Sequence, residues 1–174
     1  GRDKAKKHGF WFYFGRIMAG IGIALLLVIL YVYLSVPTYS FKEPKPFSGE
    51  YLYNPYQDMN PDLWKKYHFH CHSRKFFGLT NGRKSKEETI DSVYQALGYD
   101  HYGISDYMSI NTHNADKEGY IPAYEHGYGL IHKTHQICIG AESVYRPDFL
   151  FMQNLNLKQH MINTLGERSR FVMP

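Results

Sequence analysis

The chain has 174 residues, of which 44% are hydrophobic and 17% aromatic, and its formal net charge is +4. Five of its twenty basic residues and one of its sixteen acidic residues lie within the first sixteen positions, which leaves fifteen of each in the neutral remainder. A neutral remainder argues against a nucleic-acid-binding protein, because such a protein needs a basic excess on its folded part.

A long apolar segment follows the basic tail formed by residues 1–16. Residues 17–36, IMAGIGIALLLVILYVYLSV, contain no charge, and twenty helical residues cross about 30 Å of hydrocarbon. We therefore predict a single transmembrane helix that contacts the lipid bilayer. The basic tail predicts a cytoplasmic N-terminus, so the domain lies outside the cytoplasm, in the periplasm if the cell is Gram-negative and the membrane its inner one.

The rest of the chain divides into a tether and a domain. Residues 37–64 are rich in proline and aromatic residues and predict an extended tether that wraps part of the domain. Residues 65–174 alternate between strand and helix patterns, which predicts parallel β/α units. The expected strands are 66–71, 101–105, 136–140, 148–153 and 170–173, and the expected helices are 85–98, 121–134 and 156–166. A capping box of Ser85 and Glu88 is expected to begin the first helix and Gly98 to end it.

Two further expectations concern the cysteines and the C-terminus. Cys71 and Cys138 fall in separate apolar strands, and we expect both thiols to be free and buried rather than joined. The sequence stops at Pro174 on an expected strand, so we expect the polypeptide to continue beyond it.

Three histidines occupy alternate positions in KYHFHCHSR, residues 66–74. Successive side chains of a strand point to opposite faces, so His68, His70 and His72 are expected on one face. Imidazoles in that register favour a metal site, with a stronger case for His70 and His72 than for His68.

Other candidate residues follow the next two strands. Catalytic groups of β/α folds collect at the C-terminal ends of parallel strands, where Asp106 follows the second strand and Glu142 the third. The motifs HFHCHS, TNGRKSKEE, GISDY and IGAE occur in that order along the chain. In this order and spacing, residues 66–143 resemble the polymerase and histidinol phosphatase (PHP) family.

The resemblance implies a partial or complete distorted (β/α)7 barrel and bound metal ions. It places His70 and His72 on the histidines of the first metal and Glu142 on a carboxylate that bridges two metals. The chain departs from the family where His68 and Asn81 replace aspartates and where Tyr107 replaces a histidine. We assign Tyr107 to packing, and expect one or two Zn, Mn or Fe ions.

Two functions are compatible with these observations. The first is a membrane-anchored, metal-dependent hydrolase acting on phosphoesters outside the cytoplasm, with Asp106 and Glu142 as catalytic residues. The second is a catalytically weakened domain that serves as a structural or ligand-binding subunit of a membrane-protein complex. The departures at His68, Asn81 and Tyr107, the expected continuation of the chain and the membrane anchor favour the second, and the ordered motifs favour the first.

Overall fold

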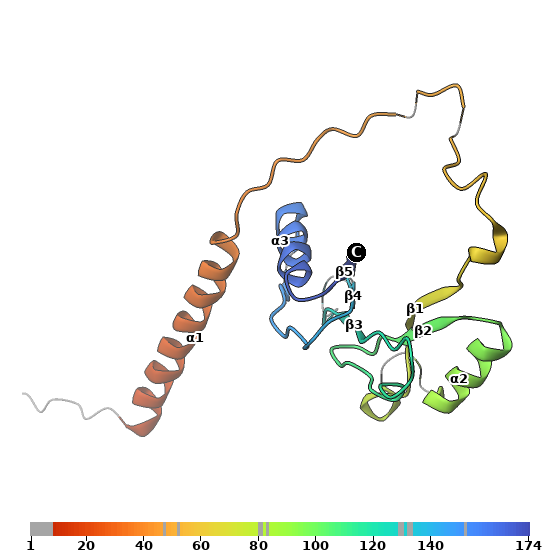
Figure 1. Cartoon of the computed structure of the whole chain (residues 1–174). Coiled ribbons are helices and arrows are strands. Elements are labelled where there is room, and N and C mark those ends of the chain that lie inside the picture. Colours follow the sequence, from red (N-terminus) through yellow and green to blue (C-terminus); the bar gives the residue numbers. More distant parts are fainter. Residues whose placement is uncertain are drawn as a thin grey trace, which may run out of the picture. The chain divides into compact units, whose positions relative to one another are not determined.

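The computed structural model describes the chain as two compact units, Gly1–Thr38 and Tyr39–Pro174 (Figure 1). The described residues are 9–46, 48–51, 53–79, 82, 84–128, 131, 134–151 and 153–174.

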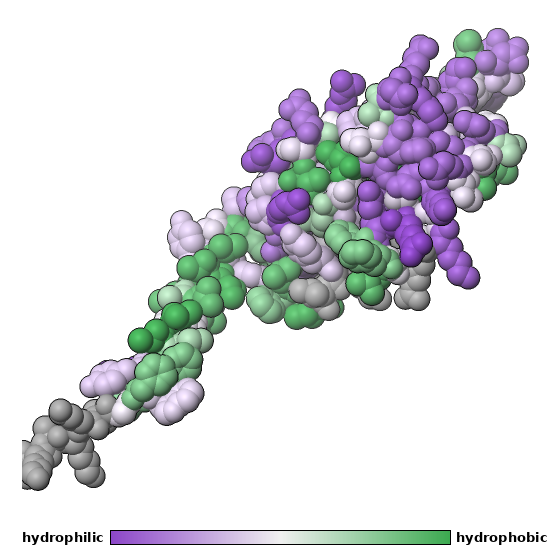
Figure 2. All heavy atoms as spheres, turned by 90° about the horizontal axis from the view of Figure 1, so that it is seen from below, coloured by the Kyte–Doolittle hydropathy of each residue, from purple (hydrophilic) through white to green (hydrophobic). Residues whose placement is uncertain are grey.

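The first unit is one helix, α1, Phe10–Leu34. It contains 25 residues and is exposed along its whole length, and it is long and apolar enough to cross a membrane. At 1.5 Å per residue it extends about 37 Å, compared with a hydrocarbon core of about 30 Å. Figure 2 shows its surface as predominantly hydrophobic. The helix begins before the predicted Ile17 because the aromatic run from Phe10 to Phe14 continues it.

The second unit begins with a parallel β/α/β arrangement, as predicted. Strand β1, Tyr67–Cys71, pairs in parallel with β2, His101–Ile104, and α2, Glu87–Ala96, connects them. Gly98 ends the helix with a φ of +67°, a left-handed conformation that glycine adopts at little cost. The predicted capping box is wrong: Lys86 is the N-cap residue, and it makes no side-chain cap.

The remaining strands form an antiparallel sheet, which corrects the prediction of parallel units throughout. The sheet has the order β3-β4-β5, with β3 at Ala123–His126, β4 at Gln136–Ile139 and β5 at Phe171–Met173. Helix α3, Leu155–Gly166, precedes β5 and was predicted. A closed seven-stranded barrel is not seen in the described part of the chain.

Two predicted elements are wrong. The segment 121–134 was expected to be a helix, but it contains β3 and then turns at Gly127, which has a φ of +122°. All four residues of β3 are buried, as in a strand covered on both faces, so its sequence lacks the alternation that marks a half-buried strand. The segment 148–153 was expected to be a strand, but its described residues form none.

The core lies where β3, β4 and α3 meet. Its most completely buried apolar side chains are Tyr124, Cys138 and Leu165. Cys71 and Cys138 are free, as predicted, although Cys71 is only half-buried.

The tether contains a short 3-10 helix, Pro61–Leu63. Tyr39, the first residue of the second unit, contacts α3, because its backbone N–H donates to Asn156 Oδ1 at 3.0 Å.

One carboxylate joins α2 to the loop that follows β2. Asp91 accepts hydrogen bonds from Tyr102, His113, Asn114 and Lys117 at 2.8 to 3.2 Å. Partial burial opposes its ionisation, but these donors outweigh burial and lower the pKa of Asp91 to about 2. The ionised carboxylate therefore stabilises the folded state.

We predict that this stabilisation, roughly 2 kcal/mol, is present above pH 4 and is lost as the pH falls from about 4 to 2. Asp91→Asn should lower the free energy of unfolding at pH 7 by about 1–2 kcal/mol. The substitution should also make the free energy of unfolding depend less on pH between pH 4 and 2. Urea unfolding of the full chain in detergent measures both, and the exposed Asp116→Asn is the matched control. Equal unfolding curves for the two variants would contradict this role of Asp91.

Candidate metal centre

A β-bulge in β1 divides the three alternating histidines. His68 pairs with Tyr102 of β2, and Cys71 pairs with Ile104. The chain therefore advances three residues along β1 while it advances two along β2. An extra residue in one strand reverses the alternation of the side chains that follow it. The register shift therefore separates His68 from His72, and the expectation that all three histidines lie on one face of a regular strand is wrong.

His68 lies against α2. Its Nδ1 is 2.9 Å from the hydroxyl of Tyr94, and its ring packs on the rings of Tyr94 and Tyr99. Burial, followed by the nearby His70, lowers the pKa of His68, so the neutral ring is favoured. These contacts assign His68 to packing under α2.

His70 and His72 lie together, with ring centroids 5.1 Å apart. His70 Nδ1 is 3.1 Å from the hydroxyl of the buried Ser105 at the end of β2, which leaves Nε2 for another partner. An imidazole that ligates a metal usually engages its other ring nitrogen in this way.

The carboxylate that joins the two histidines is Glu125. It belongs to β3, is 3% exposed, and places Oε2 at 2.7 Å from His72 Nε2. One ligand atom from each of His70, His72 and Glu125 lies within 4.8 Å of the others. Two imidazoles and a carboxylate at this spacing can hold a metal ion. We call these three residues the His-Glu cluster.

Backbone pairing delivers Glu125 to this position. Residues Tyr107 and Glu125 form a parallel bridge, in which the Glu125 N–H donates to Asp106 O at 3.1 Å and its carbonyl accepts from Met108 N at 2.8 Å. The end of β2 is thereby fixed to β3, and the carboxylate of Glu125 meets the end of β1.

A fourth residue, His135, holds the other carboxylate oxygen. Its Nδ1 lies 2.5 Å from Glu125 Oε1, and it precedes β4, the strand that pairs with β3. Two ring nitrogens, His72 Nδ1 and His135 Nε2, are buried without a hydrogen-bond partner among the described residues. Unpartnered buried nitrogens are costly, so an additional ligand would stabilise this arrangement.

Tyr107 forms a wall of the cluster. Its ring stacks on His72 at 4.6 Å between centroids and meets the edge of His135 at 5.1 Å. Burial raises the pKa of Tyr107, and the charge of Glu125 adds to the effect, so the phenol stays protonated. Both ring contacts agree with the packing role that we expected.

Asp106 anchors the loop after β1 rather than joining the cluster. Its fully buried carboxylate accepts hydrogen bonds from the backbone and hydroxyl of Ser73 and from Asn111, at 2.8 to 3.0 Å. Ser73 directly follows His72, so Asp106 fixes the backbone that carries this histidine. Its predicted catalytic role stays a prediction.

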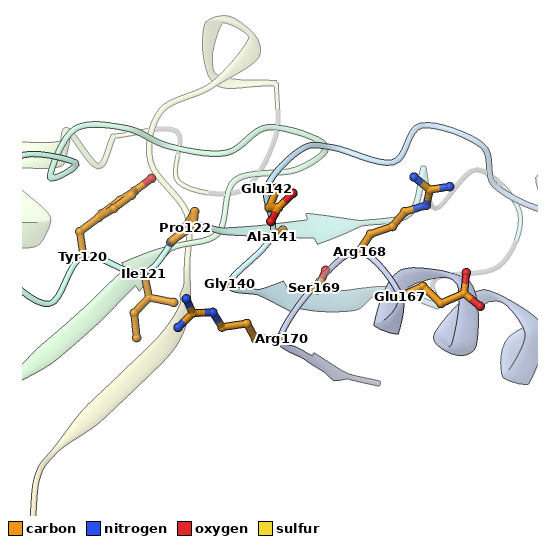
Figure 3. Close-up of a pocket in the computed structure, with 10 residues that line it drawn as sticks. All are labelled: Tyr120, Ile121, Pro122, Gly140, Ala141, Glu142, Glu167, Arg168, Ser169 and Arg170. Atoms are coloured by element: carbon orange, nitrogen blue, oxygen red, sulfur yellow. The ribbon is translucent and has the colours of Figure 1, made fainter.

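Glu142 lies apart from the two histidines. It is exposed at the end of β4, and because β4 is antiparallel to β3, this end lies beside Ala123 and away from His135. Glu142 lines a separate pocket of about 410 Å³ (Figure 3). The other residues that line this pocket are Tyr120, Ile121, Pro122, Gly140, Ala141, Glu167, Arg168, Ser169 and Arg170.

The expectation for Glu142 assumed a parallel third strand, which β4 is not. Asn81, the remaining departure from the PHP motifs beside His68 and Tyr107, lies outside the described residues.

Glu125 and His135 were missed because both fall in or beside the segment that we assigned to a helix. The signal that could have identified them is AYEHG, a short buried strand that ends at a glycine, followed by a histidine that opens the strand QICI.

No family model, no curated protein and no solved structure matches the chain. The resemblance to the PHP family thus depends on the sequence motifs alone.

We predict that Glu125→Gln weakens binding of Zn²⁺ or Mn²⁺ at least about tenfold, because it removes the negative ligand. Glu142→Gln is the matched control and should bind as tightly as the unchanged protein. Isothermal titration calorimetry of the full chain in detergent provides the affinities, with circular dichroism to verify folding. Weakening by Glu142→Gln alone would show that the metal lies at Glu142 instead.

Proposed function

We propose that the chain is a membrane-anchored, metal-dependent hydrolase that acts on phosphoesters. The observation that supports this proposal most strongly is the convergence of His70, His72 and Glu125 from two separate sheets. The ordered motifs shared with the PHP family supply the reaction class.

The donor set suits a divalent transition metal. Imidazole and carboxylate together are ligands for Zn, Mn or Fe, and the cluster provides ligands for one ion. When bound, such an ion supplies Lewis-acid polarisation of a phosphoryl group and activation of water. A second ion would need ligands outside this cluster.

The protein groups around the cluster have separate roles in this proposal. His70, His72 and Glu125 bind the ion, and Ser105 and His135 orient His70 and Glu125. The Tyr107 ring covers one face of His72 and limits the access of water there.

The second candidate is a ligand-binding or structural subunit. It is favoured by Tyr107, because a protonated phenol packed on His72 replaces a histidine of the PHP motif. Metal binding without hydrolysis would identify this alternative.

The location of the domain is also part of the proposal. Helix α1 is suited to a single crossing, and the basic residues before it favour a cytoplasmic N-terminus. The tether and domain would then face the periplasm of a Gram-negative cell, or the exterior of another cell.

One assay tests both activity and topology. The full chain is expressed in bacteria, and intact spheroplasts are supplied with Mn²⁺ or Zn²⁺ and a membrane-impermeant aryl phosphomonoester or phosphodiester. We predict hydrolysis without permeabilisation, and a loss of roughly 100-fold or more in Glu125→Gln. Glu142→Gln is again the control.

The outcomes separate the parts of the proposal. Activity that appears only after detergent is added would contradict the outward orientation. Metal-loaded protein that hydrolyses neither substrate class with or without detergent would contradict the hydrolase and favour the subunit.

A further inference from the structure

A loop directly after His72 carries three exposed apolar side chains, and no part of the metal centre uses them. The loop runs from Arg74 to Ser85, and its two ends are joined because the Arg74 N–H donates to Ser85 O at 2.8 Å. We call it the aromatic loop. Thr80, Asn81 and Arg83 in it lie outside the described residues.

The base of the aromatic loop is held firmly. Asp106 fixes Ser73 on one side, as described above. On the other side Gly82, with a φ of +80°, packs so closely that a Cβ there would lie 2.5 Å from the carbonyl oxygen of His72. The base therefore moves with the strand end that carries the metal ligands.

The tip of the loop exposes the apolar side chains. Phe77 is 99% exposed, Leu79 81% and Phe76 52%. Phe76 and Phe77 also have φ values of +48° and +57°, a left-handed conformation that is unfavourable for bulky residues. Strained backbone that displays apolar groups to solvent favours a binding role over a packing role.

The charges around the tip indicate the kind of partner. Residues 74–86 contain five basic residues and no acidic residue, although Glu87 and Glu88 follow. Arg74, Lys84 and Lys86 are exposed, while Lys75 is half-buried and 3.8 Å from Asp106. Apolar side chains flanked by cations match an anionic bilayer, whose phosphates lie above its acyl chains.

We propose that the aromatic loop docks on the bilayer, with Phe77 and Leu79 in the interfacial region and Arg74, Lys84 and Lys86 at lipid phosphates; this rests on the membrane anchoring by α1 proposed above. The bilayer is favoured over a protein partner because the same chain carries the membrane helix. The second unit begins at Tyr39, five residues after the end of α1, and five extended residues span at most about 18 Å, so the domain that carries the loop stays within reach of the surface. Docking would hold the metal centre close to the headgroups, but it does not depend on hydrolysis.

Tryptophan fluorescence in nanodiscs tests this docking. In a full chain with Trp11→Phe and Trp64→Phe, Phe77→Trp introduces a single reporter. Nanodiscs contain anionic phosphatidylglycerol and a lipid brominated on its acyl chains. We expect blue-shifted emission and strong quenching by bromine. The matched control is Leu97→Trp, at the end of α2 farther from the aromatic loop, where Leu97 is 58% exposed, and we expect no quenching there.

Substitution of the basic residues provides a second test of the docking. Each basic residue near an anionic surface strengthens binding about fivefold. Replacing Arg74, Lys84 and Lys86 with glutamine should therefore reduce the quenched fraction in the Phe77→Trp chain. Hydrogen exchange of the unsubstituted chain should show slower exchange of residues 76–79 in anionic nanodiscs than in detergent.

Two results would overturn the proposal. The first is emission of Phe77→Trp that is no more quenched than that of Leu97→Trp, with unchanged hydrogen exchange in the unsubstituted chain. The second is shielding of the reporter only after another membrane protein is added, which would identify a protein partner instead.

Discussion

The candidate metal centre depends on one short piece of backbone pairing. Glu125 donates its N–H to Asp106 and accepts from Met108, and this pairing connects the parallel and antiparallel sheets at the site. His70 of β1 and His72, which follows that strand, belong to one sheet and the carboxylate of β3 to the other, and this pairing brings them together. A carboxylate that is 3% exposed also needs compensating partners: His135 lies at Oε1, and His72 lies 2.7 Å from Oε2, which makes no hydrogen bond among the described residues and so has room for a metal ion.

The surrounding polar groups make this arrangement rigid. The carboxylate of Asp106 holds Ser73, while its carbonyl accepts from Glu125, so one residue fixes the backbone on both sides of the cluster. Ser105 fixes one nitrogen of His70, and Tyr107 stacks on His72. Ligands held before a metal arrives lose little conformational freedom on binding it, which favours affinity.

Local patterns in the sequence predicted most of the elements but not how they pair. The apolar run of α1, the β/α/β unit and α3 follow from composition, periodicity and terminal glycine, and all were expected. The direction of β4 depends on its antiparallel pairing with β3, which no local pattern encodes. The strand β3 was misread because Ala123, Tyr124, Glu125 and His126 are all buried and show no alternation.

The same limit explains the errors at the site. His70 and His72 were identified from their alternate spacing together with the resemblance to the PHP motifs. His68 was grouped with them because the bulge in β1 arises from pairing with β2 and leaves no mark in the spacing. Glu142 was chosen because β4 was assumed to be parallel, and reversing one strand moves its C-terminal residue to the other end of the sheet.

The central claim is that His70, His72 and Glu125 bind a metal ion, and X-ray absorption spectroscopy tests it most directly. The full chain in detergent is loaded with one equivalent of Zn²⁺, and its zinc edge spectrum is measured. The cluster predicts a nitrogen and oxygen shell at about 2.0–2.1 Å, with outer-shell scattering from two imidazoles that disappears in the His70→Ala and His72→Ala double variant. A shell of oxygen atoms without imidazole scattering, or sulfur at about 2.3 Å from a cysteine, would contradict the account.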